Sequence, residues 1–90
     1  MKFIVSYTIP QSTLRAAEAR FLGTGGMPPA NVTLIGRWHG MNGNGVAIVE
    51  TTDPKALYSW FADWLEFLPL NITPCLEDAE AGAVLKALNR

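Results

Sequence analysis

Two asparagine-glycine pairs, Asn42-Gly43 and Asn44-Gly45, separate two apolar runs in the middle of the sequence. Asn-Gly readily adopts the positive φ angles that a two-residue hairpin turn requires. The pattern therefore predicts two antiparallel strands that are joined at one or the other of these pairs. This hairpin is the feature around which the remaining elements have to be arranged.

Strand alternation divides the predicted hairpin into two faces, and both possible turns give the same division because they differ by an even register shift. A β-bulge at the glycines would change the division, and Gly40 makes such a bulge possible. One face mixes charged and apolar residues, whereas the other is apolar except at its end. The first comprises Ile35, Arg37, His39, Val46, Ile48 and Glu50, and the second comprises Leu34, Gly36, Trp38, Ala47, Val49 and Thr51.

A helix is predicted directly after the hairpin. Asp53 can cap its free amide groups, and Pro54 supplies the φ angle of a first helical position. The apolar residues that follow recur at the spacing of one helical face, which must be buried against a neighbouring element. The apolar face of the hairpin is the nearest such surface. The stripe consists of Leu57, Trp60, Phe61, Trp64 and Leu65.

The flanking segments complete the pattern. Residues 2–9 alternate as a strand, and a helix is predicted from Ser12 or Thr13 to about Leu22, with Leu14, Ala17, Phe21 and Leu22 facing inward. Glycines at 23–26 and the prolines after them are typical of a helix end, not of a phosphate loop, which would follow a strand. Residues 67–76 predict an edge strand because they contain two prolines. A closing helix follows, with acidic residues in its first turn.

The resulting order, β-α-β-β-α-β-α, predicts a single α+β domain over residues 1–90 with the ferredoxin-like arrangement. In this arrangement, helices cover one face of a four-stranded antiparallel sheet. The other face is either solvated or covered by the same face of a second subunit. Nearly half of the residues (49%) are apolar and only 17% are charged, which favours a homodimer.

The charge pattern argues against several classes of partner. The net charge is −1 and the seven basic residues are scattered, so we expect no nucleic-acid surface. No apolar run has the length of a membrane span, and we expect a cytoplasmic protein without a membrane partner. Cys75 is the single cysteine, and His39 the single histidine. We therefore expect no metal site, and no cofactor is indicated.

The central segment resembles a known family. Trp38, Glu50, the Asp53-Pro54 cap and the spacing Leu57, Trp60, Trp64, followed by residues 67–74, resemble a group of short bacterial proteins classed as a domain of unknown function. The resemblance covers residues 34–80 best and the first third only in outline. It implies a ferredoxin-like, dimeric α+β barrel fold, and it implies no activity.

The mixed sheet face is where the sequence places possible chemistry. In the first hypothesis, this face is a subunit interface held by ion pairs. In the second, it encloses a cavity for a small polar or aromatic molecule, and Arg37 pairs with an acid group of that molecule. In the third, His39 acts as a general acid or base tuned by Glu50, by analogy with small dimeric-barrel isomerases and monooxygenases. The catalytic candidates are His39 and Glu50. The ligand-binding candidates are Ser6, Thr8, Arg37, His39, Glu50, Asn71 and Thr73.

Overall fold

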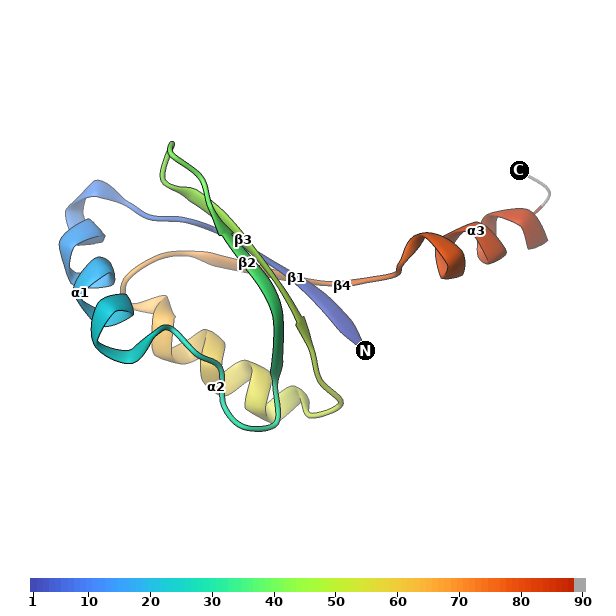
Figure 1. Ribbon diagram of the computed structural model, residues 1–90, viewed down its shortest axis with the longest axis horizontal. Coiled ribbons are helices and arrows are strands. Elements are labelled where there is room, and N and C mark those ends of the chain that lie inside the picture. The colour runs from blue at the N-terminus through green and yellow to red at the C-terminus, as the bar shows by residue number, and fades with distance from the viewer. Residues whose placement is uncertain (89–90) are drawn as a thin grey trace.

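A computed structural model describes residues 1–88, and its elements follow the predicted order (Figure 1). The strands pair antiparallel in one sheet with the order β2-β3-β1-β4, and the ferredoxin-like prediction is confirmed. The strands are β1 (Lys2–Thr8), β2 (Thr33–His39), β3 (Asn44–Glu50) and β4 (Leu70–Cys75). The helices are α1 (Leu14–Thr24), α2 (Pro54–Leu65) and α3 (Asp78–Ala87), with a 3-10 turn at Gln11–Thr13.

Helix α2 supplies one half of the core, as its apolar stripe predicts. The Asp53 carboxylate caps it by accepting from the backbone N–H groups of Lys55 and Ala56 at 3.1 and 3.2 Å. A hydrogen bond from the Asn31 amide, together with these two, holds the pKa of Asp53 below its ordinary value. Leu57 and Trp60 are buried against the sheet, where they meet Val5, Val32, Ala47 and Val49.

Strand β4 lies at an edge of the sheet and pairs only with β1, which confirms the prediction from its prolines. Pro74 lies opposite Phe3 and lacks an N–H group. An edge strand tolerates a proline because the strand has no neighbour on its outer side, where a missing N–H removes no hydrogen bond between strands.

Helix α1 begins and ends near the predicted positions, but its inward face is narrower than predicted. The Thr13 hydroxyl donates to the Phe67 carbonyl and does not cap the helix. Gly25 ends the helix at φ 75°, and its N–H donates to the Phe21 carbonyl at 2.7 Å. Ala17 is buried, whereas Leu22 is 82% exposed. The prediction that Leu22 faces inward is only partly correct: it lines the space between α1 and the sheet but is not buried, because it lies at the margin of the stripe that Leu14, Ala17 and Phe21 define.

The hairpin forms as predicted, but its turn has three residues. His39 pairs with Gly45, the Gly40 N–H donates to the Asn44 carbonyl at 2.7 Å, and residues 41–43 form the loop, with Gly43 at φ 86°. A second irregularity lies at Ile35, where the register passes from Leu34 opposite Val49 to Gly36 opposite Ile48. Both two-residue registers were therefore wrong.

These two irregularities change the faces of residues 36–39. Arg37 pairs with Ala47, and His39 with Gly45, so both side chains lie on the helix-covered face. Trp38 pairs with Val46 and lies on the opposite, open face, where it is 59% exposed and its ring covers Gly36. The prediction that placed Trp38 in the core and Arg37 with His39 outside it was wrong. The assignments of Leu34 and of the β3 residues are correct.

Helix α3 extends beyond the end of the sheet instead of packing on it (Figure 1). Glu77 and Glu80 form a capping box at its start, and Lys2 of β1 contacts Glu77 at 3.0 Å. No residue of α3 is buried, and its Val84 and Leu85 are about half exposed. The molecule is consequently elongated, with a longest dimension of 49 Å.

Candidate functional site

A cavity of about 520 Å³ lies between α1, α2 and the helix-covered face of the sheet. Its apolar walls come from β1, β4 and the two helices. Its polar side chains are those of Tyr7, Glu18, Arg37 and His39. The lining includes Val5, Ala17, Phe21, Ala47, Trp60, Trp64, Leu68 and Leu70.

Tyr7 and His39 meet across an intervening strand. His39 of β2 pairs with Gly45 of β3, and Gly45 in turn pairs with Tyr7 of β1. The two long side chains reach over Gly45, where the Tyr7 hydroxyl lies 3.1 Å from His39 Nδ1. An added Cβ at Gly45 would overlap the Tyr7 ring. The missing side chain of Gly45 therefore makes this hydrogen bond possible.

Tyr7 is uncharged at neutral pH, and its environment reinforces that state. Partial burial raises the pKa of the Tyr7 phenol above its ordinary value, and the positive charge of Arg37 opposes this shift by a smaller amount. Tyr7 thus retains both its proton and its lone pairs for hydrogen bonding.

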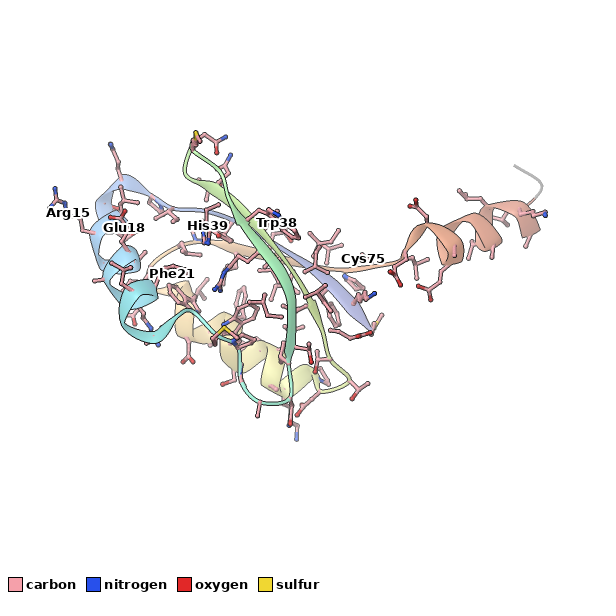
Figure 2. All side chains as sticks on the ribbon, viewed as in Figure 1. Arg15, Glu18, Phe21, Trp38, His39 and Cys75 are labelled. Atoms are coloured by element: carbon pink, nitrogen blue, oxygen red, sulfur yellow. The ribbon has the colours of Figure 1, made fainter. Side chains whose placement is uncertain are left out.

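Arg37 ties the end of α1 to the sheet. Its two terminal nitrogens donate to the carbonyl groups of Gly26 and Gly25 at 2.6 and 2.9 Å. Its guanidinium group also lies 5.0 Å from the centre of the Phe21 ring. The Phe21 ring meets His39 edge-on at 5.2 Å, so that residues of α1 and β2 close one side of the cavity (Figure 2).

Only two of the predicted site residues share this cavity. Arg37 and His39 line it, whereas the remaining candidates alternate onto the open face of the sheet or lie at its edges. Glu50 lies at the far end of β3, opposite Lys2 and Thr33, and does not approach His39. The acid-base pair of His39 with Glu50 is therefore not formed. The candidates on the open face are Ser6, Thr8, Glu50, Asn71 and Thr73.

Tyr7 is a polar residue of the cavity that the sequence analysis did not include among its candidates. It lies on the helix-covered face of β1, whereas the sequence analysis placed His39 on the other face of the sheet, so no contact between them was expected. The contact could have been predicted if the turn had been interpreted as a three-residue loop over Met41, Asn42 and Gly43. Such a loop would have placed Gly45 directly opposite His39.

Within residues 1–88, no group of three or more His, Cys, Asp or Glu side chains is arranged to hold a metal ion. Cys75 is a free, half-buried thiol at the end of β4, far along the strand from the cavity (Figure 2). None of the helices in the same part of the chain has both the length and the apolar character needed to cross a membrane.

The comparisons with known proteins give one result. The model of a family described as "Domain of unknown function (DUF3303)" matches residues 1–89. The comparison with curated proteins and that with solved structures found no match.

Proposed function

We propose that this chain, which belongs to the family described as domain of unknown function DUF3303, binds a small molecule in the cavity between its helices and its sheet. The observation that carries the proposal is the composition of the cavity wall. A volume of about 520 Å³ falls in the range of ligand sites, which are largely apolar and contain a few convergent polar groups. Tyr7 and His39 are such a polar pair, and apart from the charged Glu18 and Arg37 the other side chains of the wall are apolar or aromatic.

Binding of an uncharged, polarity-sensitive dye tests this proposal. We expect N-phenyl-1-naphthylamine to gain fluorescence with the full chain and to follow a saturable isotherm. Glu18→Trp is expected to weaken dye binding because Glu18 lies on α1 at the cavity wall and a larger side chain there narrows the cavity. A chain that gives no saturable signal would argue against a ligand cavity.

Arg15→Trp is the matched control for this variant. Arg15 is exposed on the same helix and points away from the sheet, as Figure 2 shows. The same substitution there adds an equal apolar surface to α1 without entering the cavity, so dye affinity should remain that of the parent chain. Equal weakening by both variants would point to dye bound on the surface of α1.

We further propose that a second copy of the chain covers the open face of the sheet. This face carries exposed apolar side chains, Ile4 and Trp38, among polar ones. Lys2 and Glu50 lie on it with opposite charges, so two copies related by a two-fold axis would meet without an excess of either sign. Helix α3, which buries none of its residues, adds a further apolar surface for such a partner.

Light scattering tests the assembly. We expect a mass near twice the 9.8 kDa of the chain. Ile48→Lys should give the monomer mass because Ile48 lies in the middle of the open face, between Ile4 and Gly36, and would bring two buried charges together. Tyr58→Lys on the 70% exposed outer side of α2 serves as control and should leave the mass unchanged. A monomeric parent chain would refute the assembly.

A further inference from the structure

Resting on the ligand cavity proposed above, we infer that this cavity selects an uncharged aromatic molecule with a hydroxyl or carbonyl group and discriminates against carboxylates of the same size. The inference is drawn from three properties of the wall: its rings, the bonds of Arg37 to two backbone carbonyl groups and the hydrogen-bonding capacity of the Tyr7–His39 pair.

Rings dominate the wall. Phe21 projects from α1, and Trp60 and Trp64 project from α2, while Tyr7 and His39 approach from the sheet. Aromatic surfaces favour flat partners, which they contact by offset stacking or edge to face. The Phe21 and His39 rings already adopt an edge arrangement at 5.2 Å. A cavity of about 520 Å³ has room for a ligand of two or three fused rings.

Arg37 is poorly available to pair with an acid. Both of its terminal nitrogens donate to the carbonyl groups of Gly25 and Gly26, so a carboxylate would compete with the contacts that hold the end of α1. Glu18 also lines the cavity and adds a negative charge. An anion transferred from water into this largely apolar space would therefore lose hydration, and the N–H groups of Arg37 that are not bonded to Gly25 and Gly26 would compensate for only part of that loss.

The Tyr7–His39 pair instead suits a group that both donates and accepts hydrogen bonds. If Tyr7 donates to Nδ1, a neutral imidazole retains an N–H at Nε2, and the phenol oxygen can still accept. If Nδ1 donates to Tyr7, the phenol O–H becomes the free donor and Nε2 the free acceptor. In both tautomers the pair offers one donor and one acceptor, which match a hydroxyl group, and a carbonyl group can use the donor alone.

Three ligands that share one ring system test the inference on the full chain: 2-naphthol, naphthalene and 2-naphthoate. Displacement of N-phenyl-1-naphthylamine at neutral pH gives their affinities. We expect 2-naphthol to bind about three to ten times more tightly than naphthalene, which corresponds to one net hydrogen bond. We expect 2-naphthoate to bind more weakly than naphthalene, and Glu18→Gln to reduce that disadvantage by removing a like charge.

Variants of the polar pair identify its role. In Tyr7→Phe the ring remains and the hydroxyl is lost, so the advantage of 2-naphthol over naphthalene should fall toward one while naphthalene affinity is retained. His39→Gln serves as a second variant with the same expected loss, in case Tyr7→Phe alters the packing of β1.

The possible outcomes separate the two proposals. Equal affinity for 2-naphthol and naphthalene, or tightest binding of 2-naphthoate, would overturn the ligand class and leave the cavity as a binding site. An unchanged 2-naphthol preference in both Tyr7→Phe and His39→Gln would likewise overturn it. Failure of the dye and all three ligands to bind would overturn the proposed function itself.

Discussion

Replacing Gly45 with alanine is expected to separate Tyr7 from His39 and to lower the free energy of unfolding by about 1 to 3 kcal/mol. The added Cβ would lie 2.5 Å from Cε2 of Tyr7 and closer still to Cζ and Oη of the same ring. Because these atoms belong to the end of a side chain, the ring can move aside without a shift of the backbone. Its displacement would break the 3.1 Å contact with His39 Nδ1.

Urea unfolding and naphthol affinity measure the two effects of Gly45→Ala separately. We expect 2-naphthol to lose its advantage over naphthalene in this variant, as it would in Tyr7→Phe. Gly23→Ala is the matched control: no atom lies within 4 Å of its added Cβ, and alanine is favoured over glycine in a helix by about 0.5 to 1 kcal/mol. Retention of the Tyr7–His39 pair in Gly45→Ala would contradict the role assigned to Gly45.

The order of elements could be predicted because each carries a local signal. The Asp53-Pro54 cap and the stripe at Leu57 and Trp60 fix α2, and Pro74 within β4 restricts that strand to an edge. Gly25 ends α1 because it takes a positive φ angle that most residues avoid. Such signals act over a few residues, so they do not depend on how the remainder of the chain packs.

The site could not be predicted because it depends on register, and one extra residue reverses the faces of a strand. The three-residue loop at 41–43 moves Arg37 and His39 to the helix side, and the bulge at Ile35 restores Leu34 to the face that its hydrophobicity requires. The hydrophobic pattern of β2 alone indicates neither change, because Trp38 resembles a core residue and Arg37 resembles a surface residue.

The physical reason for this arrangement lies in the partners of the two side chains. Trp38 covers the bare backbone of Gly36 on the open face, whereas Arg37 finds two carbonyl groups and the Phe21 ring on the other. An arginine beneath a helix is tolerated because its guanidinium group donates hydrogen bonds to the carbonyl groups of Gly25 and Gly26. The partners of Arg37 are remote in sequence, so no pattern within β2 contains them.

Arg37→Ala is therefore expected to lower the free energy of unfolding by about 2 to 3 kcal/mol and to weaken ligand binding. Two charge-assisted hydrogen bonds to Gly25 and Gly26 would be lost together with the contact to Phe21. The end of α1 would then no longer be fastened to β2, and the cavity wall that Phe21 provides would loosen. Urea unfolding and hydrogen exchange of the α1 amide groups measure these two consequences.

Two further variants serve as controls. Arg37→Lys tests whether positive charge alone at position 37 is sufficient, and Arg20→Ala tests whether the loss of a different arginine has the same effect. Lysine keeps the charge but has a single nitrogen, which cannot reproduce two directed bonds to adjacent carbonyl groups, so we expect it to recover less than half of the lost stability. Arg20 lies 5.6 Å over the Trp64 ring and donates to neither Gly25 nor Gly26, so its loss should leave the end of α1 as protected as in the parent. Full recovery with lysine, or equal loss of protection in Arg20→Ala, would show that the two carbonyl contacts of Arg37 do not hold the cavity closed.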